Sequence, residues 1–211
     1  MVKIKICGIT TLEDASLAAQ LGAWAVGFIF YKKSPRYIEP DKAKLIIKEL
    51  PDNIEKIGVF VDLPLDEIQD IALKTGITQI QLHGNESKDF CTEVVNKINL
   101  PVIKAIRIKD FTDLSSIPEY KNIVSAILLD SYSKNLFGGT GESFNWGIAK
   151  KAKTYNMPII IAGGINPDNV ANVYTEIQPY ALDISSGIEE YKGIKDHNKL
   201  KKLFSAVNSI L

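Results

Sequence analysis

This chain of 211 residues has few cysteines, no excess charge of either sign and no long apolar run, and each scarcity excludes a class of protein. Its two cysteines, Cys7 and Cys91, cannot form the disulfide framework of a small secreted domain. The 25 basic residues are matched by 25 acidic ones, so no basic field is available to hold a nucleic acid backbone. The first apolar run begins at Val2, which leaves no room for a signal peptide, and no run is long enough to cross a membrane. We therefore expect a protein of the reducing cytoplasm, with neither a nucleic acid nor a membrane as its partner.

Short β-branched runs alternate with amphipathic segments along the whole chain. The runs are continuously apolar more than alternating, as strands buried on both faces should be. We expect eight strands, at Val2–Cys7, Trp24–Phe30, Lys56–Val61, Gln79–Leu82, Val102–Ile106, Ala126–Asp130, Ile159–Ala162 and Ala181–Ile184. Helical patterns lie between and after them, at Thr11–Leu21, Asp41–Leu50, Pro64–Thr75, Ser87–Ile98, Asn145–Tyr155, Pro167–Ile177 and Asp196–Ile210, with the least regular pattern at Asp110–Tyr120.

The number of these βα units predicts how the sheet is closed. Eight units is the number at which a parallel sheet forms a barrel, and 211 residues with 45% apolar content are enough for one such domain. The alternative is an open, doubly wound sheet with a GxGxxG turn after its first strand. The first turn here, Cys7-Gly8-Ile9-Thr10-Thr11, lacks that pattern. We therefore predict an α/β fold in which residues 1–211 form a single (βα)8 barrel domain.

Chemically active side chains follow the expected strands. In a (βα)8 barrel the loops after the strands build one face, and the active site lies there. The expected strand ends carry, in chain order, Cys7, Ser34-Pro35-Arg36, Asp62, His83-Gly84, Arg107, Asp130, Gly163-Gly164 and Ser185-Ser186-Gly187. A free cysteine is often only a small buried hydrophobe, and we interpret Cys91 in this way. For Cys7, the convergence of a thiol with carboxylates, Arg and His on one rim favours an active site.

The turns after the last two expected strands predict a phosphate site. Gly163-Gly164 follows the seventh strand and Ser185-Ser186-Gly187 follows the eighth. The loops at these two positions form the common phosphate site of (βα)8 barrels. Glycines let backbone N–H groups approach a phosphate, and a helix amino terminus adds a favourable dipole. Two ordinary tight turns are the alternative.

Arg36 and Asp130 are candidates for binding and catalysis. Arg36 forms planar bidentate pairs with carboxylates or phosphates, so with a phosphate elsewhere on the rim it is a candidate for a second anionic group; the alternative is a solvated surface Arg. Asp130 ends an apolar strand, where desolvation should raise its pKa and suit it to act as a general acid; the alternative is a turn cap. The glycine-rich segment 138–141 beside it could be a lid or a solvent loop.

Ordered motifs over nearly the whole chain resemble those of one enzyme family. They are, in chain order, Lys5-Ile6-Cys7-Gly8, Ser34-Pro35-Arg36, Gly58-Val59-Phe60-Val61, Gln81-Leu82-His83-Gly84, Leu129-Asp130, Gly138-Gly139-Thr140-Gly141 with Phe144 and Trp146, Ala162-Gly163-Gly164-Ile165, and Asp183-Ile184-Ser185-Ser186-Gly187-Ile188-Glu189. Each motif is weak alone, but the ordered set is specific. The chain resembles the phosphoribosylanthranilate isomerases of tryptophan biosynthesis.

The resemblance implies a reaction and roles for particular residues. The reaction is the Amadori rearrangement of N-(5′-phosphoribosyl)anthranilate to 1-(2-carboxyphenylamino)-1-deoxyribulose 5-phosphate, with no cofactor or metal. It implies that Asp130 protonates the furanose ring oxygen, that Cys7 removes the proton from C2′, and that Arg36 holds the anthranilate carboxylate. His83 and Asp183 are expected as further substrate contacts. The partner is then a small phosphosugar, and the protein a monomer or a homodimer.

The residues also bear on this chemistry independently. A free thiol is only a few per cent ionised at neutral pH, so Cys7 needs help to act as a base, and Lys5 on the same strand face is a candidate source of positive charge. A metal-dependent sugar-phosphate epimerase is an alternative, but of the two histidines only His83 is expected on the rim, because His197 falls in the last helix. A phosphosugar-binding sensor is another alternative, which would not need both a thiol and a carboxylate.

Overall fold

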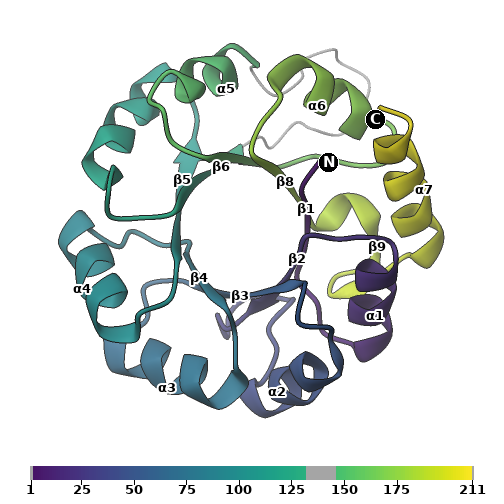
Figure 1. Ribbon diagram of the computed structural model, residues 1–211, viewed down its shortest axis with the longest axis horizontal. Helices are drawn as coiled ribbons and strands as arrows, with labels where there is room; N and C mark the ends of the chain where they lie inside the picture. The colour runs from purple at the N-terminus through teal and green to yellow at the C-terminus, as the bar shows by residue number, and fades with distance from the viewer. Residues whose placement is uncertain (1, 132–145, 211) are drawn as a thin grey trace.

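The chain forms a closed barrel of eight parallel strands surrounded by helices. The computed structural model describes residues 2–131 and 146–210, so the glycine-rich segment 138–141, expected beside the site, lies outside the described residues. Figure 1 shows the strands as a central ring with the helices outside it. The strands pair in chain order, and β1 closes the ring by pairing with both β2 and β8. The predicted (βα)8 architecture is confirmed.

The strands agree closely with the apolar runs of the sequence. They are β1 Ile4–Cys7, β2 Ala25–Ile29, β3 Glu55–Phe60, β4 Gln79–Leu82, β5 Val102–Ile108, β6 Ala126–Ser131, β7 Ile159–Ala162 and β8 Ala181–Ile184. The largest differences are at β1, which starts two residues later than expected, and at β5, which ends two residues later. The agreement follows from burial on both faces, because each strand must present apolar side chains to the barrel interior and to the helices.

The helices follow the expected pattern, with local differences that have a visible cause. They are α1 Leu12–Gln20, α2 Pro40–Glu49, α3 Leu65–Thr75, α4 Lys88–Ile98, α5 Trp146–Lys153, α6 Val170–Ile177 and α7 His197–Asn208. Thr11 and Ser87 cap α1 and α4 by accepting backbone N–H groups of the first turn. Pro64, expected at a first helical position, lies instead at the N-cap of α3. The segment with the least regular pattern forms a 3₁₀ helix, η1 Phe111–Tyr120.

Two features differ from the sequence-based expectation. The helix expected from Pro167 begins only at Val170, because the Asn166 side chain accepts the backbone N–H groups of Asp168 and Asn169 and holds a turn there. After β8 the chain forms a short 3₁₀ helix, η2 Ser186–Ile188, and then an antiparallel hairpin that was not expected. The hairpin consists of β9 Glu189–Tyr191 and β10 Ile194–Lys195.

The core lies in two layers, and the alternation of strand residues between them positions the site. The larger layer fills the space between the barrel and the helices, and the smaller fills the barrel interior. On β8, Leu182 and Ile184 belong to the outer layer and Ala181 to the inner one, so Asp183 shares the inward face. Inward positions at the carboxyl ends of the strands are therefore where polar side chains can reach a common space. In the described part of the chain no helix has the length and apolarity needed to span a bilayer.

Candidate active site

A cavity of about 320 Å³ lies at the carboxyl ends of the strands and collects most of the predicted site residues. Its lining consists of Cys7, Ile29, Tyr31, Ser34, Arg36, Val59, Val61, Gln81, His83, Asp130, Ala162, Gly163, Gly164, Ile165, Asp183, Ser185 and Ser186. Gly187 does not line the cavity. A Cβ at this position would clash with the carbonyl oxygen of Ile165, so the glycine allows the turns after β7 and β8 to pack together. Arg107, on the expected rim, lines a separate hollow beside η1.

Cys7 is buried at the end of β1, where its environment opposes ionisation. The residue is only 7% exposed, and it lines the cavity. Burial raises the pKa of the Cys7 thiol above its ordinary value, and the positive charge of Lys5 acts against this without cancelling it. The expectation that Lys5 lies on the same face is confirmed, but the thiol of the ligand-free protein is a weaker acid than a free cysteine.

Lys5 is held by an ion pair that also orients Asp183. The Nζ of Lys5 lies 2.9 Å from Oδ2 of Asp183, and both side chains are buried. Burial alone would lower the pKa of Lys5, but the charges of Asp183 and Cys7 raise it above its ordinary value, so Lys5 stays protonated. Among the described residues, Oδ1 of Asp183 has no hydrogen-bond partner although it is buried. Asp183 thus keeps one acceptor oxygen for a group that enters the cavity.

A chain of polar contacts from β4 reaches Asp130 at the end of β6. Nε2 of His83 lies 3.2 Å from Oδ2 of Asp130, and Nδ1 of His83 lies 2.7 Å from Nε2 of Gln81. With the amide as assigned, Gln81 donates to Nδ1, and His83 donates its other N–H to the carboxylate. The side chain of Asp130 is 34% exposed, so it is more open than its apolar strand predicted. His83 therefore fixes the orientation of Asp130.

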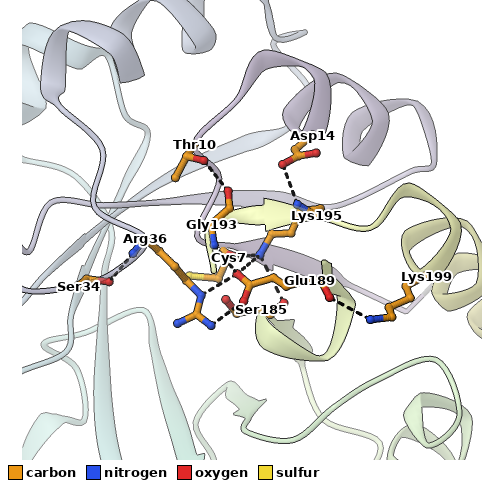
Figure 2. Close-up of polar contacts among 10 residues, drawn as sticks. All are labelled: Cys7, Thr10, Asp14, Ser34, Arg36, Ser185, Glu189, Gly193, Lys195 and Lys199. Carbon is orange, nitrogen blue, oxygen red and sulfur yellow. Dashed lines mark hydrogen bonds and ion pairs between the residues drawn. The ribbon is translucent and has the colours of Figure 1, made fainter. Parts of the chain in front are cut away.

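Arg36 reaches the cavity from the loop after β2, and its guanidinium is already engaged on one edge. Its Nε and Nη2 donate to Oε1 and Oε2 of Glu189, at 2.7 and 2.6 Å (Figure 2). The hydrogen bond to Glu189 raises the pKa of Arg36 further. Burial would raise the pKa of Glu189, but the hydrogen bond from Arg36 and the charge of Lys195 outweigh it and hold that pKa below its ordinary value. Arg36 is therefore an ordered cation and not a solvated surface side chain.

Lys195 contacts Glu189 and thereby supports its ion pair with Arg36. Its fully buried ammonium donates to the backbone carbonyl of Cys7 at 2.7 Å and lies 3.1 Å from Oε1 of Glu189 (Figure 2). Burial lowers the pKa of Lys195 despite the charge of Glu189. Neither residue was identified as a site residue from the sequence. Glu189 is the last residue of the motifs that carry the resemblance, and Lys195 lies two residues after Gly193, a turn-forming glycine whose φ of +88° closes the hairpin.

The turns after β7 and β8 have the features expected of an anion site. Gly163 and Gly164 have φ values of +95° and +66°, which favour glycine. Within the described residues no acceptor is found for the backbone amides of Gly164 and Ser186. In the same part of the chain, the buried hydroxyl oxygen of Ser185 has no hydrogen-bond partner. Unpaired donors at the rim of a cavity are suited to hold an anion.

The described residues hold no group of three or more His, Cys, Asp or Glu side chains arranged for a metal ion. His197, the second histidine, pairs with Asp14 at 2.9 Å near the start of α7 and does not line the cavity. Cys91 is fully buried in α4, as its pattern predicted, and burial raises the pKa of its thiol to about 11. The ionisable groups that line the cavity are chiefly Cys7, Asp130, Asp183, Arg36 and His83, together with the polar side chains of Tyr31, Ser34 and Gln81 and the turns after β7 and β8.

Comparison with known proteins agrees with this arrangement. The family model of N-(5′-phosphoribosyl)anthranilate isomerase matches residues 4–206. An N-(5′-phosphoribosyl)anthranilate isomerase of Geotalea uraniireducens is 46% identical over 210 residues, which cover the whole of both chains. The crystal structure of phosphoribosyl anthranilate isomerase from Thermotoga maritima superposes with a TM-score of 0.91 at 37% identity, over 99% of this chain and 100% of that one.

A second solved isomerase was determined with a ligand. It is described as a complex with reduced 1-(o-carboxyphenylamino)-1-deoxyribulose 5-phosphate, and it superposes with a TM-score of 0.89 at 35% identity, over 99% of this chain and 100% of that one. The family match, the near-complete overlap and the shared barrel agree with the resemblance inferred from the sequence motifs. The chain belongs to the N-(5′-phosphoribosyl)anthranilate isomerase family.

Proposed function

We infer that the protein catalyses the Amadori rearrangement of N-(5′-phosphoribosyl)anthranilate to 1-(2-carboxyphenylamino)-1-deoxyribulose 5-phosphate, a step of tryptophan biosynthesis. The observation that carries the assignment of roles is the juxtaposition of Cys7 and Asp130 in one cavity. They come from β1 and β6, which are separated by β7 and β8 around the barrel. A thiol and a carboxyl group on different walls can work on different atoms of one bound sugar.

Asp130 acts first, as the general acid. It donates a proton to the furanose ring oxygen, the bond between that oxygen and C1′ breaks, and the nitrogen lone pair forms an iminium with C1′. His83 donates a hydrogen bond to Oδ2 of Asp130 and so leaves Oδ1 to carry the proton. The partial exposure of Asp130 lets this carboxyl face the ligand and not the core.

Cys7 acts second, as the general base. As the iminium forms, the Cys7 thiol releases its own proton to solvent, and the thiolate then removes the proton from C2′ while the electron pair moves to neutralise the iminium. The resulting enolamine tautomerises to the ketone by losing the proton of its C2′ hydroxyl and gaining one at C1′. Although burial raises the pKa of the free thiol, the iminium brings positive charge beside it. Lys5 already supplies a second cation at this position, and both charges favour the thiolate when it is needed.

The remaining groups bind the two ends of the substrate. Arg36 presents the edge of its guanidinium not used by Glu189 to the anthranilate carboxylate. The turns that contain Gly164 and Ser186 hold the phosphate through backbone N–H groups. The unpaired oxygen of Asp183 accepts a hydrogen bond from a sugar hydroxyl. Gly163 and Ser185 complete the phosphate turns, and Gly187 supports them from behind.

These roles need no cofactor or metal, since the proton transfers use only side chains of the chain. We propose that residues 1–211 act as a single catalytic domain in the cytoplasm, as a monomer or homodimer. Its partner is the small phosphosugar substrate.

The assignment is tested by a turnover assay on the purified protein. Freshly generated phosphoribosylanthranilate should be consumed, as followed by its fluorescence, at a rate proportional to enzyme concentration. Binding of the ligand without turnover would support a phosphosugar sensor on the same barrel. Turnover of a different sugar phosphate with none of phosphoribosylanthranilate would support an epimerase.

A further inference from the structure

Arg36 is held by a group outside the cavity. Arg36 lines the cavity, whereas Glu189, which binds its Nε and Nη2, does not. A carboxylate that grips this side of a guanidinium leaves free the edge formed by Nη1 and the second hydrogen of Nη2. The Glu189 contact therefore decides which edge of the guanidinium can meet a ligand and in which plane it lies.

Glu189 is itself fixed by a set of donors from the hairpin. Its Oε1 accepts the backbone N–H of Gly193 at 3.2 Å and the ammonium of Lys195 at 3.1 Å, in addition to Arg36. Its backbone carbonyl accepts the ammonium of Lys199 at 2.9 Å (Figure 2). The Glu189 side chain is only 6% exposed. A buried carboxylate with this many charged and backbone donors has little freedom to rotate.

The stem of Arg36 is confined as well. A Cβ at Gly8 would lie 2.6 Å from Cδ of Arg36, so the side chain passes directly over the backbone of the turn after β1. The backbone N–H of Arg36 also donates to the hydroxyl of Ser34, at 3.1 Å. The guanidinium is thus held at its stem by the first βα turn and at its head by the hairpin.

Arg36, Glu189 and Lys195 together carry one net positive charge. Arg36 and Lys195 are each positive, and Glu189 neutralises one of these two charges. The ammonium of Lys195 donates to Glu189 and to the backbone carbonyls of Cys7, at 2.7 Å, and Ser185, at 3.4 Å. Of the three side chains Arg36, Glu189 and Lys195, Arg36 is therefore the one that presents positive charge to the ligand.

We propose that Glu189 is a positioning residue that aims Arg36 at the substrate carboxylate and thereby sets the preference for a carboxylated aromatic amine. The proposal rests on the assigned role of Arg36. Removing the carboxylate of Glu189 frees the Arg36 guanidinium to rotate. Binding of the substrate must then order this side chain, and the lost conformational entropy lowers the affinity. The loss of affinity should be large for ligands that carry the carboxylate and small for ligands that lack it.

The experiment compares two ligands, the reduced product 1-(2-carboxyphenylamino)-1-deoxyribitol 5-phosphate and its phenylamino counterpart without the carboxylate. Their dissociation constants are measured by calorimetry with the unaltered protein, Arg36→Met, Glu189→Gln, the double variant and Glu190→Gln. Glu190 is the matched control because it is the neighbouring, exposed glutamate. Thermal melts establish that each variant is folded.

The unaltered protein and the Glu190→Gln control should prefer the carboxylated ligand by about tenfold or more. Glu189→Gln should lower this preference by about tenfold, mainly through the carboxylated ligand, with affinity for the other ligand within about twofold. In the Arg36→Met background the same change should have no further effect on the preference. With the natural substrate, Glu189→Gln should raise KM more than it lowers kcat.

Equal weakening of both ligands by Glu189→Gln would mean that Glu189 only supports the fold, and additive losses in the double variant would mean that it does not act through Arg36; either result overturns the proposal. If Arg36→Met keeps the preference, the assigned role of Arg36 is wrong and the proposal fails with it.

If Glu189→Gln does not fold, Glu189→Asp takes its place. It retains the charge but is shorter by one methylene, and it should lower the preference at least threefold; an unchanged preference overturns the proposal.

Discussion

At the scale of single residues, Cys7 is the position where the environment and the proposed chemistry are in tension. A base must be deprotonated to act, yet burial raises the pKa of this thiol and Lys5 only partly offsets the effect. The tension is resolved if the thiolate forms only when ring opening of the bound substrate places the positive charge of the iminium beside Cys7. Two predictions separate the resting thiol from its catalytic role.

The first prediction concerns the protonation state of the ligand-free protein. Because burial raises the pKa of the Cys7 thiol above that of a free cysteine, the thiol should remain protonated at neutral pH and ionise at a higher pH than a free cysteine does. The measurement is thiolate absorbance against pH in Cys91→Ala, with Cys7→Ser/Cys91→Ala as the blank that removes the tyrosine contribution. A midpoint below that of a free cysteine in a short peptide would show that the cations around Cys7 outweigh its burial.

The second prediction is that Cys7→Ser loses kcat by roughly 10²–10⁴-fold, the usual contribution of a general base. A serine hydroxyl fits the same space but is a far poorer base than a thiolate. Binding of the reduced product should change little, because the thiol is not assigned a binding role. Steady-state turnover and calorimetry measure the two quantities, and a near-normal kcat would remove Cys7 from the mechanism.

The third prediction is that Asp130→Asn loses kcat by a similar factor of roughly 10²–10⁴ and stays folded. The amide has nearly the same shape and can still accept a hydrogen bond from His83, but it cannot deliver a proton. Turnover and a thermal melt test the two halves of this statement. If the rate does not change, ring opening uses another acid.

At the scale of structural elements, the turns after β7 and β8 and the hairpin that follows divide the work of binding. In the proposed function the turns offer backbone N–H groups to the phosphate, whereas the hairpin brings Glu189 to Arg36 and Lys195 to the carbonyl of Cys7. Lys195 is near these turns in the sequence, but it is buried in that network and is therefore not a neutral control for phosphate binding. Lys192, which is exposed at the hairpin tip, is the appropriate one.

The fourth prediction is that Gly164→Val weakens binding of phosphorylated ligands by about tenfold or more. Gly164 has a φ of +66°, which a β-branched residue adopts only under strain, and we expect the valine side chain to crowd the backbone amides proposed to hold the phosphate. Calorimetric titration with the reduced product measures the loss.

Two control variants separate the phosphate site from general strain. Gly22→Val places the same residue at a φ of +91° with no atom within 4 Å of the new Cβ, so it imposes backbone strain away from the site. Lys192→Gln removes the nearby exposed charge. Both should bind the phosphorylated ligand within about twofold of the unaltered protein. Equal losses in Gly22→Val and Gly164→Val, or a large loss in Lys192→Gln, would contradict phosphate binding by the turns.

At the scale of the whole molecule, barrel closure brings β1 beside β8 although 178 positions separate Lys5 from Asp183. The same closure places β6, with Asp130, across the cavity from Cys7. The two-layer core makes this arrangement rigid, because apolar side chains fill both the interior and the space beneath the helices. The proposed catalytic groups, which come from distant parts of the chain, are thus held at one rim.

Sequence patterns alone determined the strands, their parallel order and the loops that carry the site. Period and composition are local properties, and burial on both faces makes each strand a continuous apolar run. The same patterns placed Cys7, Arg36, His83 and Asp130 at strand ends, and the cavity confirms that these side chains share one space.

Only the tertiary structure decided how those side chains are partnered and therefore what state they are in. The contact of Glu189 with Arg36 joins positions 153 residues apart, and that of Lys195 with the Cys7 carbonyl joins positions 188 apart, so no local pattern could predict either. The same is true of the raised pKa of Cys7, because desolvation is a sum over all elements packed around a group. The sequence determined which groups reach the rim of the barrel, and the packing of distant segments determined their protonation and the orientation of their side chains.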